Sequence, residues 1–232
     1  MPKHGKKYLA AAAKVDQNRL YTPDEAIVLV RETSYVNFDP TVEVHLRLGI
    51  DPRHADQNIR TTVALPHGTG KSVRVLVFAQ GEAVQASLDA GADFAGSDEL
   101  IARIDKENFF DFDVAIATPD MMGKVGRIGR KLGPRGLMPN PKSGTIVPAE
   151  DLPRTIREVR GGRVEFRNDK TGILHVAIGK LSFPPEQIRE NFNALMDAVK
   201  AAKPSGAKGT FIRSVTLTST MGPGVPVNPT LA

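Results

Sequence analysis

The chain has 232 residues, of which 41% are hydrophobic and 25% charged, so it can build two modest cores and is not a disordered protein. Its formal net charge is +5, and the absence of cysteine excludes disulfides, thiol catalysis and zinc–thiolate sites. The longest strongly apolar run, VLVFA, is far too short for a membrane span and no signal segment opens the chain, so we expect a soluble cytoplasmic protein without a membrane partner.

The first predicted elements have clear local signals. In YTPDEAIVLVRET, Thr22 can cap a helix, Pro23 suits its first position and Glu25 completes a capping box. The segment TVEVHLRLGI, residues 41–50, alternates apolar and polar side chains, which is typical of a strand with one buried and one exposed face. IRTTVAL, residues 59–65, is a second candidate strand.

The middle of the chain has a different pattern. VRVLVFA (73–79) and FDVAIAT (112–118) are almost wholly apolar, as in strands buried on both faces. Helical patterns follow at 82–93, 97–109 and 149–160. Alternation of strands with helices predicts an α/β layer built on a parallel sheet.

After Gly161 the half-exposed pattern returns. RVEFR (163–167) and ILHVAIG (173–179) are predicted strands joined by the turn NDKTG, and residues 184–204 form an amphipathic helix. The strand FIRSVTLTST (211–220) is the last predicted element.

The two ends of the chain therefore share one pattern and the middle has another. We expect an α+β domain from residues 1–67 and 160–232, with an inserted α/β domain at 68–159. The glycine-rich crossings LPHGTGK and VRGGR would form a hinge. Two sequential domains with a boundary near Gly161 are the alternative.

No motif predicts catalysis, a cofactor or a metal. GTGKS (68–72) resembles the end of a P-loop, but Leu65 stands where the first glycine is required and a strand follows instead of a helix. The glycines at 123, 126 and 129 do not have dinucleotide-fold spacing, and the five histidines form no metal pair at helical spacing. We expect no enzyme.

Positive charge gathers in one segment. Residues 123–142 contain no acid, and no Asp or Glu follows Asp197, so a polyanion is a favoured partner. GRIGRKLGPRGLMPNPK (126–142) is interpreted as a basic loop whose arginines are spaced to meet phosphates, although an ordinary solvated loop would have the same composition. The basic candidates of this segment are Lys124, Arg127, Arg130, Lys131, Arg135 and Lys142.

A row of hydroxyls marks the last strand. If 211–220 lies in one sheet with 41–50, the exposed face carries Thr41, Glu43 and Arg47 beside four alcohols on alternate positions. Short alcohols suit the 2′-hydroxyls and backbone oxygens of the wide RNA minor groove, and Glu43 can accept a hydrogen bond from a 2′-hydroxyl. Threonines also line exposed strand faces without any function. The alcohols are Ser214, Thr216, Thr218 and Thr220.

Five blocks in order, FDPTVEVHLRLGIDPR, LPHGTGK, GPRGLMPNPKSGT, EFRNDKTGILH and KGTFIRSVTLTSTMGPG, resemble the bacterial form of the ribosomal protein L-one family over essentially the whole chain. The resemblance implies two domains, the second a three-layer Rossmann-like α/β insertion without a nucleotide role. It also implies a ribosome-bound monomer that binds the side stalk of large-subunit ribosomal RNA, assists release of deacylated exit-site tRNA, and represses its own operon's messenger RNA.

The resemblance also implies an RNA surface on the first domain, with the basic segment as an auxiliary contact. Carried over by motif, this surface comprises Phe38, Thr41, Glu43, Asp169, Lys170, Thr171, Ser214, Thr216, Thr218, Thr220, Met221 and Gly222. Two other functions are alternatives, and each implies a different binding behaviour. A phosphate-ligand enzyme would bind a nucleotide in its α/β domain, and a general nucleic-acid protein would bind DNA and RNA stems equally.

Overall fold

The computed structural model describes residues 4–231. The chain divides into two compact units, one formed by Met1–Gly70 with Val164–Ala232 and the other by Lys71–Arg163. The inserted domain was expected at residues 68–159, and the second unit of the structure spans Lys71–Arg163. Both units combine helices with sheets, so the predicted mixed class of α+β and α/β is confirmed.

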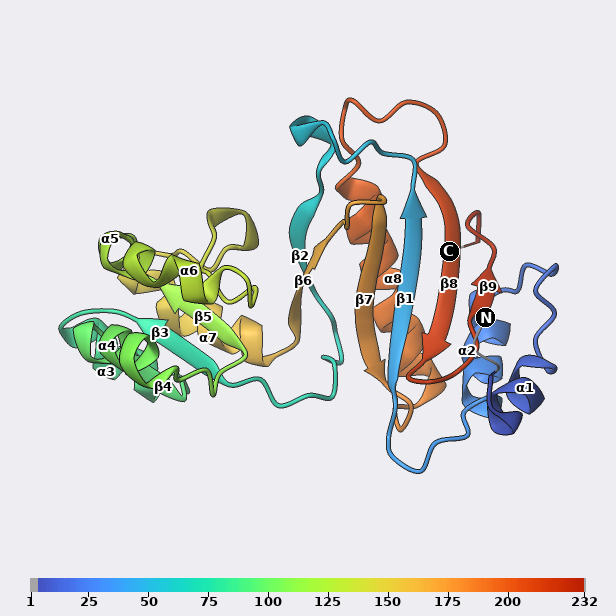
Figure 1. The fold of residues 1–232 in the computed structure, drawn as a ribbon, viewed down its shortest axis with the longest axis horizontal. Coiled ribbons are helices and arrows are strands. Elements are labelled where there is room, and N and C mark those ends of the chain that lie inside the picture. Colours follow the sequence, from blue (N-terminus) through green and yellow to red (C-terminus); the bar gives the residue numbers. More distant parts are fainter. Residues whose placement is uncertain (1–3, 232) are drawn as a thin grey trace. The chain divides into compact units, whose positions relative to one another are not determined.

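The first unit is built around a four-stranded antiparallel sheet with the strand order β7-β1-β8-β9 (Figure 1). Strands β1 and β8 come from opposite ends of the chain, yet they pair directly, with Val44 opposite Leu217 and Leu46 opposite Val215. The elements of this unit are α1 (Lys6–Ala12), α2 (Pro23–Glu32), β1 (Thr41–Leu48), η1 (Ala55–Gln57), β2 (Arg60–Ala64), β6 (Arg163–Arg167), β7 (Ile173–Lys180), α8 (Pro185–Ala201), β8 (Ile212–Ser219) and β9 (Val225–Val227).

One face of this sheet is covered by helices. Alternate side chains of β1, β7, β8 and β9 form one hydrophobic cluster with α2 and α8, and α8 runs behind β7 and β1 in Figure 1. Phe192 and Leu195 of α8 are fully buried there, and burial of a side chain of this size contributes about 1.5–3 kcal/mol. The alternation predicted for 41–50 and 211–220 therefore reflects a sheet with one covered face and one free face.

Local signals fix the ends of α2. The Thr22 hydroxyl accepts a hydrogen bond from the backbone N–H of Glu25, whose carboxylate accepts one from the backbone N–H of Thr22. Pro23 occupies the first turn. The predicted capping box is confirmed, and it satisfies two backbone donors that a helix start leaves open.

The strands β6 and β7 belong to different sheets. β6 pairs with β2 in a separate two-stranded sheet, while β7 joins β1 in the large one. The NDKTG segment therefore turns the chain from one sheet to the other, and Asn168 fastens it because its side chain accepts a hydrogen bond from the backbone N–H of Ile59.

The second unit has three layers. Its parallel sheet has the order β4-β3-β5, with one hydrophobic cluster involving α4, α5 and α6 and another involving α3 and α7. The elements are β3 (Val75–Phe78), α3 (Glu82–Asp89), β4 (Phe94–Gly96), α4 (Asp98–Glu107), β5 (Val114–Ala117), η2 (Pro119–Met121), α5 (Met122–Val125), η3 (Gly126–Ile128), α6 (Gly129–Leu132), η4 (Pro141–Ser143), η5 (Ala149–Asp151) and α7 (Leu152–Arg160).

The interpretation of 126–142 as a basic loop is wrong for its first part. Residues 122–132 form the consecutive short helical turns α5, η3 and α6. Val125, Ile128 and Leu132 are buried against Leu76 and Phe78 of β3, so the apolar side chains hold the turns on the sheet. The glycines keep each turn short, but they do not release the segment from the fold.

Candidate nucleic-acid interface

The free face of the four-stranded sheet carries the predicted row of hydroxyls. On β1 the outward residues are Glu43, His45 and Arg47, which lie opposite Thr218, Thr216 and Ser214 of β8. Ser214 is exposed, and the threonines are half-buried in the surface and lie outside the hydrophobic core. The two sequence-distant segments therefore lie side by side and present their alcohols on one face.

Two of the alcohols already have partners within the protein. The Thr220 hydroxyl accepts a hydrogen bond from the backbone N–H of Thr41 at 3.1 Å and lies 3.3 Å from the Thr41 carbonyl, to which it can donate. The Thr218 hydroxyl lies 3.2–3.3 Å from the carbonyls of Ser219, Gly222 and Pro223 and can donate to one at a time. These side chains fix the backbone around the row.

The other two alcohols are available for a ligand. Within residues 4–231, the side chains of Ser214 and Thr216 form no hydrogen bond. Each can donate one hydrogen bond and accept others, at little cost in rotamer freedom. Ser214 and Thr216 are thus the alcohols best suited to meet a polar partner at this face.

The turn after β8 has a fixed and strained shape. Met221 has a φ of 68°, a left-handed conformation uncommon for a residue with a side chain, and its side chain is exposed. The Tyr35 hydroxyl donates a hydrogen bond to the Met221 carbonyl at 2.7 Å. At Gly222 a Cβ atom would collide with the Ser219 hydroxyl, so packing inside the turn already requires glycine. Phe38 is a second exposed apolar side chain, 56% accessible, in the segment that leads into β1.

Asp169 holds the turn between β6 and β7. Its carboxylate accepts hydrogen bonds at 2.8 Å from the backbone N–H groups of Ile173 and Thr171 and from the Thr171 hydroxyl. These bonds, that from Ile173 first, lower the pKa of Asp169 to about 2. Lys170 at the tip is exposed and forms no ion pair with another residue of the described chain. Asp169 and Thr171 therefore shape the turn, and Lys170 is the residue it displays.

A histidine pair, which the sequence reasoning missed, occupies the same face. His45 and His175 are opposite one another on β1 and β7, with their Nδ1 atoms 2.8 Å apart. Their Nε2 atoms lie 3.8 Å from a Glu43 oxygen and 3.7 Å from an Asp169 oxygen, respectively. Burial and then His175 lower the pKa of His45, while Glu43 opposes this effect. Both histidines were visible as outward residues of alternating strands, but only the strand order shows that they touch.

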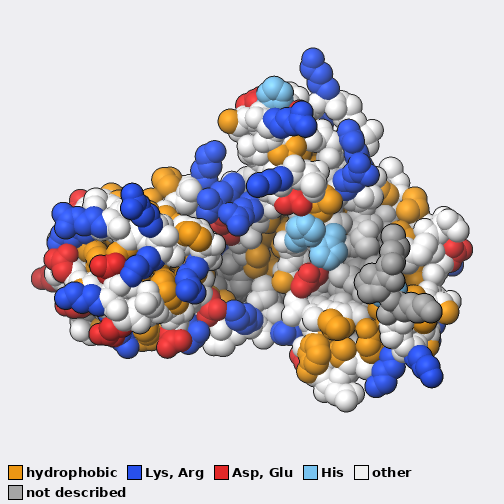
Figure 2. Space-filling model, viewed as in Figure 1, with side chains coloured by type: hydrophobic (Ala, Val, Ile, Leu, Met, Phe, Trp, Pro, Cys, Tyr) orange, Lys and Arg blue, Asp and Glu red, His pale blue; other side chains and the backbone are white. Residues whose placement is uncertain are grey.

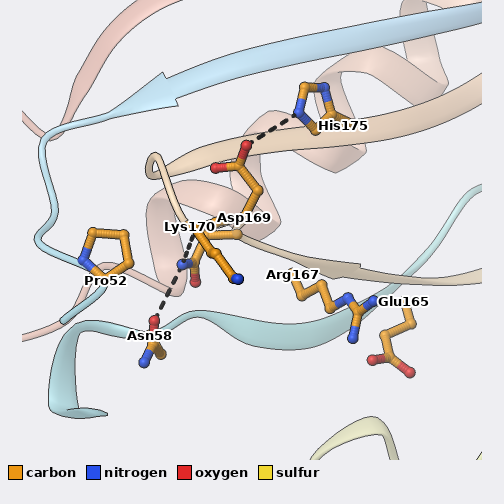
Figure 3. A pocket seen from close by; sticks show the side chains of 8 residues that line it. Pro52, Asn58, Glu165, Arg167, Asp169, Lys170 and His175 are labelled. Atoms are coloured by element: carbon orange, nitrogen blue, oxygen red, sulfur yellow. Dashed lines mark hydrogen bonds and ion pairs between the residues drawn. The ribbon is translucent and has the colours of Figure 1, made fainter. Parts of the chain in front are cut away.

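A polar groove of about 680 Å³ adjoins this face in the first unit (Figure 3). Figure 3 shows Lys170 extending from the turn toward the side where Arg167 and Glu165 lie. The lining residues are Pro52, Asn58, Glu165, Arg167, Asn168, Asp169, Lys170 and His175. The groove thus extends from the turn and His175 to β6.

Some of the candidate basic residues of the second unit are paired with acidic residues, and others are not. Lys124 pairs with Asp98 at 2.7 Å and Lys131 with Asp105 at 3.1 Å, because α4 brings its acids beside the short helical turns. The guanidinium of Arg135 lies over the ring of Phe110. Arg127 and Arg130 form no ion pair within the described range. Counting acids along the sequence could not show this neutralisation, since Asp98 and Asp105 lie outside the basic segment.

The described residues contain no cluster of histidine and acidic side chains suited to a metal ion. No helix within residues 4–231 combines the length and apolar character of a membrane span.

A sequence profile of the ribosomal protein L1p/L10e family matches residues 30–223. The chain belongs to this family. It is 87% identical over 232 residues to the large ribosomal subunit protein uL1 of Chloroflexus aurantiacus, covering 100% of this chain and 98% of that protein. It is 84% identical over 228 residues to the protein of the same name from Chloroflexus aggregans, covering 98% and 96% of the two chains.

Family membership settles the class of function. The chain is a ribosomal protein, a structural component of a ribonucleoprotein in the cytoplasm, and not an enzyme. The predicted family is confirmed, as are the ribosome-bound location and the assignment to a non-enzymatic class.

Proposed function

We propose that this protein binds the side stalk of large-subunit ribosomal RNA, beside the exit site for deacylated tRNA, through the free face of its four-stranded sheet. The observation that carries the proposal is the direct pairing of β1 with β8, which sets hydroxyls and a carboxylate side by side on an uncovered face. The names of the curated relatives, large ribosomal subunit proteins, support a place on that subunit.

The face has the chemistry that recognition of folded RNA needs. Ser214 and Thr216 offer hydroxyls without partners in the described chain, and Glu43 offers an acceptor. A carboxylate repels phosphate but accepts a hydrogen bond from a 2′-hydroxyl or a base amino group, so this surface favours RNA over DNA. Lys170 adds a cation for the backbone.

The remaining residues of the proposed surface hold its shape or add apolar contact. Thr220, Thr41 and Thr218 fix the strand ends, and Asp169 with Thr171 fixes the turn. Phe38 and Met221 are exposed apolar side chains that would pack on ribose or base surfaces. Gly222 keeps the Met221 turn compact.

In the second unit, Arg127 and Arg130 would supply an auxiliary, sequence-independent contact to phosphates. Release of exit-site tRNA and repression of the protein's own messenger RNA would use the same capacity to bind folded RNA. For repression, the messenger must present a structure similar to the stalk at the sheet face.

The proposal is tested with variants of the two free alcohols. Ser214→Ala combined with Thr216→Val should weaken binding of a side-stalk RNA fragment by about 1–3 kcal/mol, because their RNA partners are left desolvated and unpaired. Thermal stability should stay unchanged, since neither hydroxyl bonds within the described protein.

The matched control is Thr61→Val, a half-buried strand threonine in the two-stranded sheet. Calorimetry with the RNA fragment and with a DNA stem of equal length gives both affinity and selectivity. Full affinity in the double variant, or equal binding of DNA and RNA by the unchanged protein, would contradict the proposal.

A further inference from the structure

A series of four neighbouring titratable side chains crosses the free face of the sheet. It runs from Glu43 through His45 and His175 to Asp169, with the two Nδ1 atoms facing at 2.8 Å. Figure 2 shows this face, with two adjacent histidine side chains and acidic side chains beside them. The proposed function gives the two histidines no role.

The number of protons on the two histidines decides how many hydrogen bonds these four side chains can form. Two neutral histidines have two N–H groups, and the contact between the Nδ1 atoms uses one of them. One Nε2 atom then carries a proton, while the other points a bare lone pair toward a carboxylate. A third proton gives both Nε2 atoms an N–H and keeps the central hydrogen bond. A fourth would place two N–H groups against each other at 2.8 Å.

We propose that His45 and His175 share a single positive charge when RNA is bound, and that RNA binding takes up the proton that carries this charge and so strengthens as the pH falls. The inference rests on the proposed RNA-binding function and deepens it, because it assigns two further contact residues to the same surface. The ligand group is the ribose 2′-hydroxyl with its neighbouring phosphate.

The spacing between histidine and carboxylate at each end of this series fits a hydroxyl. The separations of 3.8 and 3.7 Å between Nε2 and carboxylate oxygen are too long for direct hydrogen bonds. A 2′-hydroxyl placed beside either gap can accept from the imidazole N–H and donate to the carboxylate. Deoxyribose lacks this group, so the two gaps add to the preference for RNA.

The surroundings of His45 disfavour its charged form before RNA arrives. Burial and the second histidine lower the pKa of His45, against the opposing effect of Glu43. A phosphate near the pair adds negative charge and favours the cation. Opposite Glu43, His45 and Arg47, the neighbouring strand β8 places the uncharged Thr218, Thr216 and Ser214. The charged residues near the pair are Glu43 and Arg47 on β1, and Asp169, Lys170, Glu165 and Arg167, which line the same groove as His175.

The sign of the pH dependence follows from linkage. A group whose pKa is higher in the complex than in the free protein takes up a proton on binding, so affinity rises as the pH falls. For one shared proton the expected gain is about three- to tenfold between about pH 8 and about pH 6.

The test measures the affinity of the full chain for a side-stalk RNA fragment across this pH range at constant ionic strength. His175→Gln and His45→Gln keep amide hydrogen bonding but do not titrate, so each should reduce the gain to less than about twofold. His54→Gln is the matched control, because His54 lies near Asp51 in a loop outside the sheet. Calorimetry in buffers of different ionisation enthalpy should count about one proton taken up by the unchanged protein.

Strong RNA binding without pH dependence, or a pH dependence that survives in both pair variants, would overturn the histidine proposal and leave the proposed function standing. Loss of pH dependence in His54→Gln would do the same. Failure to bind the RNA at any pH would overturn both proposals together.

Discussion

Thr220 serves the protein as well as the proposed surface. Its hydroxyl and its backbone N–H both bond to Thr41, so one residue in the turn after β8 fixes the beginning of β1. From the sequence, Thr220 appeared as a fourth equal member of the hydroxyl row. The structure separates the row into Ser214 and Thr216, which face solvent without a protein partner in the described chain, and two threonines that hold the backbone.

Thr220→Val should therefore lower both stability and binding. The backbone N–H of Thr41 loses its acceptor, so the free energy of unfolding should fall by about 1–2 kcal/mol in urea titration. Affinity for stalk RNA should fall by about 1–3 kcal/mol. Thr220→Ser keeps the hydroxyl and serves as the control. A valine variant as stable as the unchanged protein would contradict the role assigned here.

Some features of single residues could be predicted from the sequence, and others could not. Outward and inward positions on β1 and β8 followed from alternation, because a half-buried strand enforces it. The contact between His45 and His175 did not, because it depends on β7 being the neighbour of β1. The collision that requires Gly222 also depends on the path of the turn back over Ser219.

At the level of elements, the turn between β6 and β7 is held by one carboxylate. Asp169 accepts its hydrogen bonds most strongly when it is ionised, and its pKa of about 2 lies below the ordinary value of 3.8. A depressed pKa contributes stability above the unfolded-state value, and this contribution is lost as the pH falls through the folded-state value.

Asp169→Asn should thus destabilise the protein near neutral pH. The difference in unfolding free energy from the unchanged protein should shrink as the pH is lowered from about 5 toward about 1, because below the folded-state pKa both proteins carry a neutral group at this position. Asp197→Asn, an exposed position on α8, is the control. A destabilisation that stays constant over this range would show that the ionised carboxylate is not what holds the turn.

Helices and strands with a strong period were predicted within a few residues. α2 and α8 have caps or prolines at their starts and an apolar stripe, and β3 and β5 are continuous apolar runs. β4 was missed because three residues are too few to show a period. The turns at 122–132 were missed because each is too short to look helical by itself, and they are stabilised by packing in one cluster with β3 and α4.

For the whole molecule, the two units have different proposed tasks. The first presents a shaped hydrogen-bonding face, and the second presents cations, of which Arg127 and Arg130 have no ion pair within residues 4–231. The glycine-rich crossings between the units remain a predicted hinge. On the side of the first unit, buried Asn191 anchors one crossing, because its amide bonds to the backbone of His67 and Gly68.

Removal of the two free arginines should change salt dependence more than selectivity. Arg127→Gln with Arg130→Gln should flatten the slope of log affinity against log salt by about 0.7–0.9 for each lost phosphate contact. The ratio of RNA to DNA affinity should stay the same. Arg154→Gln, an exposed residue paired with Glu158, is the control. A change confined to sequence preference would contradict an auxiliary phosphate contact.

The most direct test is to crosslink the protein to RNA in cell lysate, sequence the attached RNA and identify the crosslinked peptides. The account predicts reads from the side stalk of large-subunit ribosomal RNA, joined to peptides from β1, from the turn before β7 and from β8 with its following turn. Crosslinks that fall instead on the helix-covered side, at α2 or α8, or RNA reads without the stalk, would contradict it.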